Sequence, residues 1–354
     1  MLKTLEMKNF TCFPEAKLEF SPGLNVIVGE NGTGKSHLLK LGYAVLRSLA
    51  GQDKAPAKEV YYRDLAKDLK EIFKAEALGN LCSTGKTQCS VKSSWEDNGN
   101  LDFDFSDKAQ DLVKLQNLEF APLTQQPVFI PPKEILSVYY GFQAALEKRE
   151  LDFDATYLDL ARSLSSTSLK GEELQKVFPY FTKLEKEHIK ANVLQRGGRF
   201  YFDRDPSVAS GQKNSPSGKD MEASLMAEGF RKLGVLVYLI KNGSLGEGTS
   251  LFWDEPEANL NPKLLTALAA ILVKLSSIMQ ITVATHSLFL MRELDICFRK
   301  RSESPKKVLF TGLHTQDNGA ISCIQSEKIS EIGDIAALDA SLEQTDRFMA
   351  VRSL

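Results

Sequence analysis

The sequence predicts an α/β fold in which a mixed sheet is flanked by helices and a long, mostly helical insertion divides the chain. Three observations carry this prediction. Short apolar runs typical of buried strands lie at 26–28, 251–253 and 281–284. Helix-period apolar residues follow the first run, and helix and strand patterns alternate again from residue 221 onward. With 354 residues, of which 43% are hydrophobic, the chain is long enough for one large domain plus an insertion.

The first apolar run leads into a glycine-rich turn and then a helix. The stretch "NVIVGENGTGKSHLLKL" at 25–41 contains the spacing G-x-x-x-x-G-K-S from Gly29 to Ser36. Glycines in this pattern let backbone N–H groups curl around an anion at a helix N-terminus. The loop therefore predicts a P-loop NTPase that holds a nucleoside triphosphate, with Lys35 on the β and γ phosphates and Ser36 on Mg²⁺. The residues expected to contact the nucleotide from this loop are Glu30, Asn31, Gly32, Thr33, Gly34, Lys35, Ser36 and His37.

A chance glycine-rich turn is the alternative to this interpretation. It is disfavoured because the pattern lies between a strand and a helix, which is the context that the motif requires.

Composition excludes several classes of protein. The formal net charge of −2 provides no global basic field for nucleic acid, although a local patch remains possible. The five cysteines are odd in number and lack paired C-x-x-C spacing, which argues against a disulfide framework and a zinc site. No apolar stretch reaches the roughly 20 residues that a membrane span needs, and the first residues do not resemble a secretion signal. We therefore expect a cytoplasmic protein with reduced thiols and no membrane partner.

The patterns along the chain suggest three parts. We expect an ATPase core from 1–50 and 221–325, an insertion from 51–220, and a helical tail from 326–354. Alternating residues predict hairpins at 90–105 and 193–203, a short strand at 127–132 and helices over roughly 133–192. The hairpin at 90–105 is expected to complete the N-terminal lobe. No internal repeat or long heptad run is present, which excludes an extended coiled-coil arm.

Two later strands end in residues suited to nucleotide chemistry. "SLFWDEPEANLNP" (250–262) ends its apolar run in Asp254, expected to hold Mg²⁺ through water, and Glu255, expected to polarise the attacking water. "ITVATHSLFLM" (281–291) delivers His286 to a strand end, where ligands bind in open α/β sheets, and we expect it to contact the γ phosphate. Taken singly, solvated acids and a structural histidine would explain both strand ends; the phosphate loop makes the catalytic interpretation stronger.

The phosphate loop, "FWDEPEANLNP" and "ATHS", in this order, resemble the ATP-binding-cassette (ABC) ATPases. Within them the chain is similar to the RecF/SMC/OLD-like branch, which includes AAA-type defence and repair ATPases. The resemblance covers residues 1–50 and about 220–292. It implies an ABC-type fold, ATP and Mg²⁺ as cofactors, and a homodimer or higher oligomer that forms on ATP. By the same resemblance, Asn261 would stand in the loop that crosses to a second subunit, at a position where an aspartate is common.

The resemblance also implies a signature segment that caps the ATP of the opposing subunit. A Ser-Gly-Gly-Gln run is usual, but this chain has Ala227, Glu228 and Gly229 in "LMAEGFRKLGVLVYLI" (225–240). Ala227 lacks the hydroxyl, and Glu228 adds negative charge that Arg231 and Lys232 are placed to offset. We therefore expect a weak cap and slow ATP hydrolysis.

Other polar residues give weaker signals. Gln125, Gln126 and Glu134 are alternatives for a side chain that senses metal and water, although a polar surface loop explains each more simply. A basic run of Arg299, Lys300, Arg301, Lys306 and Lys307 suits DNA phosphates, but a solvated loop is the more usual structure for such a run.

Three functions remain open from the sequence. The first is an ATPase switch or sensor in bacterial anti-phage defence, acting with a separate effector such as a nuclease or toxin. The second is a RecF/SMC-like repair ATPase that binds duplex DNA. The third, the nucleotide-binding subunit of a transporter, is disfavoured by the long insertion and the altered signature segment.

Overall fold

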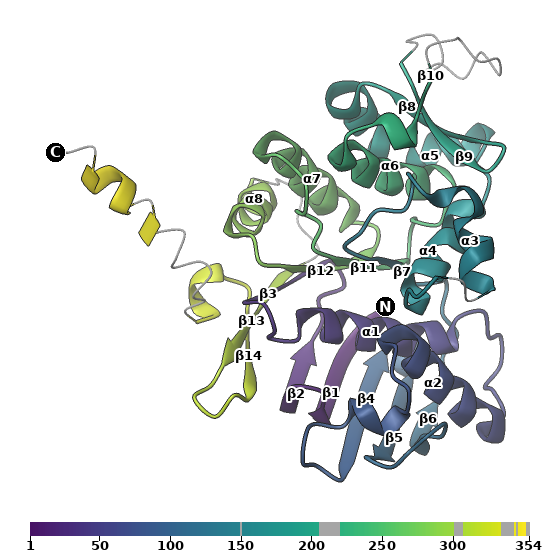
Figure 1. Ribbon diagram of the computed structural model, residues 1–354, viewed down its shortest axis with the longest axis vertical. Coiled ribbons are helices and arrows are strands. Elements are labelled where there is room, and N and C mark those ends of the chain that lie inside the picture. Colours follow the sequence, from purple (N-terminus) through teal and green to yellow (C-terminus); the bar gives the residue numbers. More distant parts are fainter. Residues whose placement is uncertain (149–150, 205–219, 301–306, 334–342, 345, 352–354) are drawn as a thin grey trace.

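The computed structural model describes residues 1–148, 151–204, 220–300, 307–333, 343–344 and 346–351. Its central element is a six-stranded sheet in the order β14-β13-β3-β12-β11-β7, shown nearly edge-on in Figure 1. All neighbouring strands run parallel except the pair β13 and β14. The strands are β3 (Leu24–Gly29), β7 (Val128–Ile130), β11 (Ser250–Asp254), β12 (Gln280–Thr285), β13 (Val308–Thr315) and β14 (Ile321–Ser326).

A second, five-stranded antiparallel sheet lies beside the first, in the order β2-β1-β4-β5-β6 (Figure 1). Its strands are β1 (Leu2–Phe10), β2 (Phe13–Glu19), β4 (Gln88–Trp95), β5 (Asn100–Ser106) and β6 (Lys114–Glu119). The hairpin predicted at 90–105 is confirmed as β4 and β5. Because β4 pairs with β1, this hairpin extends the N-terminal sheet.

Helices cover both faces of the central sheet. Helix α1 (Lys35–Leu49) lies between the two sheets, with α2 (Lys58–Phe73) beside it (Figure 1). Helices α7 (Pro262–Leu275) and α8 (Leu288–Arg299) cover the opposite face. Side chains alternate accordingly along β11: Leu251 and Trp253 join the core beneath α7, whereas Phe252 packs on the α1 side. Burial on both faces explains why these strands are continuous apolar runs.

The second half of the insertion forms a helical lobe at the end of the central sheet (Figure 1). Its elements are α3 (Tyr139–Glu147), α4 (Ala155–Ser165), α5 (Gly171–Lys183), a π-helical turn (Leu184–Ile189) and the strands β8 (Asn192–Arg196), β9 (Arg199–Asp203) and β10 (Asp220–Glu222). The hairpin predicted at 193–203 is confirmed as β8 and β9. Helix α6 (Glu228–Lys241) packs within this lobe and carries the segment that resembles the ABC signature. Short 3-10 turns occur at Leu78–Leu81, Glu96–Asn98, Ala223–Leu225 and Ile329–Glu331.

Several expectations fall partly outside the described residues. These include residues 205–219 of the predicted insertion, 301–306 of the basic run and much of the predicted tail. Residues 343–344 and 346–351 of that tail are helical. All five cysteines are free thiols, as expected. Within the described ranges, no helix is both long and apolar enough to cross a lipid bilayer.

Candidate functional site

The phosphate loop connects the end of β3 to the start of α1. The N-cap residue Gly34 has a φ of 87°, in the left-handed region that glycine tolerates. A Cβ atom at this position would lie 2.5 Å from the Cys12 sulfur and 2.7 Å from the Phe13 ring. The turn between β1 and β2 therefore packs directly against the phosphate loop, and only glycine fits at the contact. No acidic residue lies in the first turn of α1, which leaves the positive end of the helix dipole available to an anion.

The Lys35 side chain lies against the backbone of the phosphate loop. Its ammonium donates hydrogen bonds to the carbonyl oxygens of Gly29 (2.9 Å) and Glu30 (2.7 Å). Burial lowers the pKa of Lys35, whereas the nearby carboxylates of Glu255 and Asp254 favour its charged form. The loop thus holds a cation where phosphate oxygens would approach, and no carboxylate of the described residues forms an ion pair with it.

Asp254 ends β11, two strands away from the phosphate loop. The residue is 3% exposed, and this burial raises its pKa to about 6, although a hydrogen bond with the Ser36 hydroxyl acts in the opposite direction. Its Oδ1 atom is buried and has no hydrogen-bond partner among the described residues. An unpartnered buried carboxylate oxygen beside a serine hydroxyl is the donor set expected for Mg²⁺.

The remaining ligands of such a metal would come from elsewhere. Within the described ranges, no group of three or more His, Cys, Asp or Glu side chains is placed to hold a metal. Mg²⁺ is commonly held by one or two protein oxygens, with phosphate and water completing its octahedron. Ser36 and Asp254 therefore fit Mg²⁺ bound together with a nucleotide better than a metal bound alone.

Glu255 occupies a strained position directly after Asp254. Its φ is 45°, unusual for a residue with a side chain, and its N–H donates to the Ala284 carbonyl on β12 at 2.9 Å. This bend takes the chain off the sheet edge and leaves the Glu255 side chain about one third exposed. The structure thus brings a second carboxylate to the same sheet edge, less buried than that of Asp254.

Glu257 connects the second and third segments of the site, and the sequence analysis did not single it out. Its Oε1 accepts hydrogen bonds from the Thr285 hydroxyl (2.6 Å) and the His286 backbone N–H (3.0 Å). The Nδ1 atom of His286 lies 3.3 Å from the same oxygen and 3.9 Å from Glu255 Oε1. Glu257 therefore orients the His286 ring beside Glu255. The sequence did contain a signal for Glu257. It is a further carboxylate, two residues after Glu255, and it directly follows a proline in a turn.

His37 and the tip of the loop complete the predicted phosphate-loop set. His37 lies on α1 with its ring edge against Phe73, at 5.7 Å between ring centres. Burial and the nearby Lys40 lower its pKa, and its Nδ1 has no partner among the described residues. Asn31 and Gly32 are exposed. The Thr33 hydroxyl donates to the Glu30 carbonyl at 2.8 Å and so helps to close the turn.

The segment that resembles the signature makes contacts within its own chain. The Asn259 side-chain amide donates to Glu228 Oε1 at 2.7 Å. A Cβ atom on Gly229 would lie 2.8 Å from the Asn259 carbonyl oxygen, so α6 and the turn after Glu255 approach too closely for a larger residue. Ala227 is the N-cap of α6 and makes no side-chain hydrogen bond there.

We expected Arg231 and Lys232 to offset the charge of Glu228. This expectation is only partly correct. Arg231 donates to Glu134 at 2.6 Å, so its charge is neutralised by a different carboxylate, which is itself buried. Lys232 is buried and donates to backbone carbonyls, although it is close enough to be attracted by Glu228. The alternative Glu134 is thus held by Arg231 in this structure.

Asn261, expected to cross to a second subunit, has a local role. It is the N-cap of α7, and its side-chain oxygen accepts from the Leu264 N–H at 3.0 Å. This position lies near Gly229 through the 255–260 turn.

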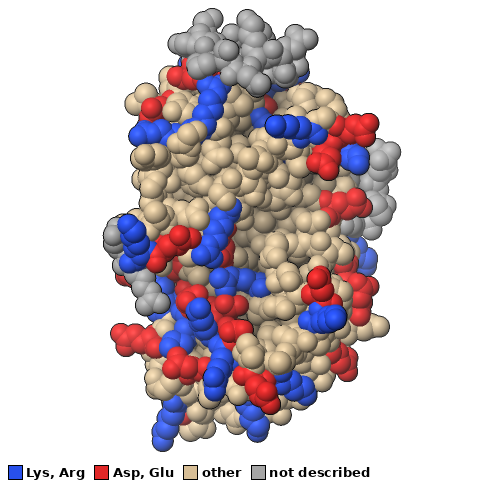
Figure 2. Space-filling view, turned by 90° about the vertical axis from the view of Figure 1, so that its right-hand side faces the viewer, with Lys and Arg blue, Asp and Glu red and all other residues tan. Residues whose placement is uncertain are grey.

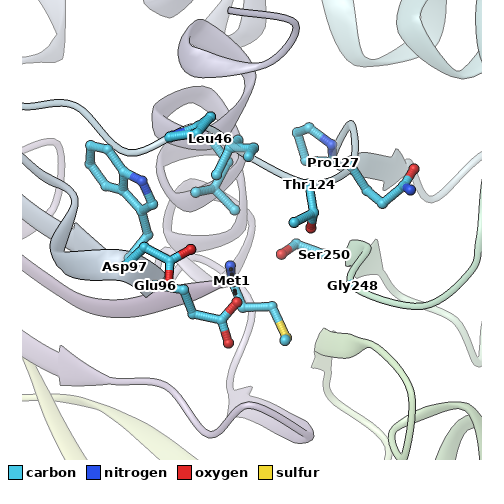
Figure 3. Close-up of a pocket in the computed structure, with 12 residues that line it drawn as sticks. Met1, Leu46, Glu96, Asp97, Thr124, Pro127, Gly248 and Ser250 are labelled. Carbon is cyan, nitrogen blue, oxygen red and sulfur yellow. Dashed lines mark hydrogen bonds and ion pairs between the residues drawn. The ribbon is translucent and has the colours of Figure 1, made fainter. Parts of the chain in front are cut away.

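The strand topology is wrong for Gln125 and Gln126 as side chains that sense metal and water. Both precede β7, which runs parallel to β11, so they lie at the amino-terminal edge of the sheet, opposite Asp254. Gln125 lines a small cavity of about 20 Å³ at this edge, together with Thr124, Gly248 and Ser250 (Figure 3). Across that cavity, the Met1 amino group contacts Glu96 at 3.2 Å. The cavity has room for about one water molecule and is remote from the phosphate loop.

Comparison with known families identifies this arrangement. A family model described as "AAA domain" matches residues 4–196. The chain belongs to the AAA domain family. A second model, described as "AAA domain, putative AbiEii toxin, Type IV TA system", matches residues 107–292. The predicted ATPase of the RecF/SMC-like branch is therefore confirmed at the level of family and fold.

Relatives of this AAA-domain chain match it over short segments. The chain is 48% identical over 40 residues to a DNA double-strand break repair Rad50 ATPase from Archaeoglobus fulgidus, covering 11% of this chain and 4% of the relative. It is 46% identical over 39 residues to a DNA replication and repair protein RecF from Lactococcus lactis subsp. lactis, covering 11% of each. The chain thus aligns with only a small part of either relative.

Solved structures match the fold along most of the chain. The SmcHead bound to the C-winged helix domain of ScpA superposes with a TM-score of 0.51 and 14% identity, covering 93% of this chain and 98% of that one. An Smc head domain with an extended coiled coil, bound to a ScpA domain derived from Pyrococcus furiosus, gives 0.50 and 14%, covering 98% and 99%. At these identities the likeness establishes a shared fold.

Proposed function

We propose that this AAA-domain protein binds and hydrolyses ATP with Mg²⁺, and that ATP joins two copies of the chain. The observation that carries the proposal is the meeting of Lys35, Asp254 and His286 at the carboxyl ends of three neighbouring parallel strands. More than 200 residues separate the first of these from the other two. Such convergence is what nucleotide chemistry at a sheet edge requires.

Each residue has a distinct part in the proposed reaction. The Lys35 ammonium transfers from the loop carbonyls to the β and γ phosphate oxygens. The Glu255 carboxylate orients the attacking water and accepts its proton, and His286 donates to the γ phosphate from the position that Glu257 sets. Ser36 and Asp254 would hold Mg²⁺, which would supply positive charge against the phosphates.

Dimerisation is proposed because Asn31, Gly32 and the His286 side chain are exposed, so a second chain can approach them. A second chain would supply Ala227, Glu228 and Gly229 opposite the phosphate loop. Without a hydroxyl at Ala227, and with Glu228 bound to Asn259, this cap provides few donors, which supports slow turnover.

Two variants separate binding from hydrolysis. Lys35→Ala should abolish ATP binding, measured with a fluorescent nucleotide, because the loop loses its only cation. Glu255→Gln should keep ATP binding and double the mass measured by light scattering with ATP and Mg²⁺, because the closed state is not hydrolysed. Equal loss of binding in both variants, or no change of mass with nucleotide, would contradict the proposal.

The biological setting that we favour is DNA repair or replication. The relatives named above are repair proteins, and the solved structures that share the fold are Smc heads. The face in Figure 2 carries interspersed basic and acidic side chains without a broad basic stripe, so a DNA surface would have to lie on another face or form in the dimer. In the basic run, Arg299 pairs with Asp295 and Lys307 with Glu327, which makes this run a weak candidate for phosphate contacts.

A duplex-binding measurement tests this setting. Fluorescence anisotropy of labelled duplex with the Glu255→Gln variant and ATP should show binding that weakens at least tenfold between about 50 and 200 mM salt. Binding that ignores both nucleotide and salt would count against it. The second family description, which names a toxin of a Type IV toxin–antitoxin system, favours a defence switch with a separate effector as the second candidate.

A further inference from the structure

Lys232 is a buried lysine on the second turn of α6. Lys232 is 2% exposed. A lysine is almost never fully buried unless its charge is paired. The ammonium donates to the Glu255 carbonyl oxygen at 2.5 Å and lies 3.5 Å from the Ala258 carbonyl oxygen. No carboxylate among the described residues forms an ion pair with it. Its hydrogen bonds are therefore made to one short backbone turn.

That turn is the one that presents the water-activating carboxylate. Glu255 and Asn259 both have positive φ, at 45° and 64°, in the left-handed region that residues with a side chain seldom adopt. Two such residues within five positions persist only when surrounding contacts hold them. Lys232 supplies such contacts, bonding a carbonyl at the start of the turn and approaching a second one near its end.

The charges around Lys232 fit the same role. The carboxylates of Glu257, Glu255, Glu228 and Asp254 all attract the ammonium, and burial opposes its charge. The Lys232 ammonium therefore offsets part of the negative charge that would otherwise face the triphosphate. Three of these carboxylates lie on the turn or the strand before it, and Glu228 lies on α6 itself.

We infer that Lys232 is a positioning residue for ATP hydrolysis: it joins the signature helix to the backbone of Glu255 and so fixes the direction of the catalytic carboxylate. The Lys232 ammonium contacts the backbone carbonyl groups of the turn. It acts through Glu255. This inference rests on the proposed ATPase function and adds a route, within one chain, by which movement of α6 changes the alignment of the attacking water.

The test compares two buried lysines on the same helix. Lys232→Met should lower the kcat for ATP about 100-fold, because displacement of a catalytic group by about 1 Å has an effect of this size. The Kd for ATP should stay within about threefold, since the phosphate loop is unchanged. Lys241→Met is the matched control: Lys241 is also buried, at the far end of α6, and pairs with Glu185. The control should lose stability and keep the wild-type kcat.

A second variant guards against failure to fold. Lys232→Gln keeps an N–H donor for the carbonyls without the charge, and its kcat should lie between those of wild type and Lys232→Met. The inference is overturned if both Lys232 variants hydrolyse ATP at the wild-type rate, or if their losses of kcat and stability match those of Lys241→Met. A wild-type protein that binds ATP without hydrolysing it would instead overturn the proposed function.

Discussion

Replacing Asp254 by asparagine should stabilise the nucleotide-free protein while removing its response to Mg²⁺. The wild-type carboxylate is buried, and one of its oxygens lacks a partner among the described residues. Asparagine has nearly the same shape, still accepts a hydrogen bond from Ser36 and carries no charge to desolvate. Burial of the ionised carboxylate is thus a local cost that the metal site imposes on the fold.

The size of this effect follows from the pKa of Asp254. Burial raises that pKa from 3.8 to about 6, and at roughly 1.4 kcal/mol per unit this corresponds to about 3 kcal/mol. The folded state binds the proton more tightly than the unfolded chain does. Stability of the nucleotide-free protein therefore falls as pH rises from about 4 to 6, and the full cost is present above pH 6.

Urea denaturation without nucleotide, at pH 5 and pH 7.5, measures this cost. The Asp254→Asn variant should be about 1 to 3 kcal/mol more stable than wild type at pH 7.5, and about half of that difference should remain at pH 5. Addition of Mg²⁺ and ATP should stabilise wild type much more than the variant. A variant that is less stable at pH 7.5, or a difference that does not change with pH, would refute the reasoning.

Three further substitutions test other contacts. Gly34→Ala should weaken both folding and ATP binding, seen in thermal melts and nucleotide titration, because its Cβ would meet the Cys12 sulfur at 2.5 Å and its φ would be strained; unchanged binding would contradict the packing described. Glu134→Gln should cost about 2 kcal/mol in urea denaturation, because the buried pair with Arg231 loses its charge; a neutral result would mean that the pair is not a net contributor. Glu257→Gln should lower kcat by at least about tenfold with ATP binding retained, because a neutral amide holds the histidine beside it less firmly; a wild-type rate would exclude a positioning role.

The positions of several predicted site residues at one sheet edge follow from local pattern. The phosphate loop, Asp254 and His286 each follow an apolar run, and parallel strands bring such ends to one edge. The hairpins at 90–105 and 193–203 were equally local, since each has turn residues between alternating strands.

The contacts between segments were not predictable in the same way. Nothing in "FRKL" distinguishes Lys232, which is buried, from Arg231, which pairs with Glu134; the difference depends on how α6 packs against a turn more than twenty residues away. The alternative role for Gln125 was wrong for a related reason. A residue before a strand and one after it are adjacent in sequence and lie on opposite edges of the sheet.

The pairing of β3 has a consequence for synthesis of the chain. Among the described strands, its residues 24–29 pair with β12 (281–285) on one side and β13 (308–313) on the other. At about 5–20 residues per second, those partners emerge on the order of 15 to 60 s after β3 itself. During this interval the nascent strand "LNVIVG" has two unpaired edges, a strong template for aggregation. We expect the newly made chain to depend on early folding of the N-terminal sheet against α1, or on a chaperone, until its later third arrives.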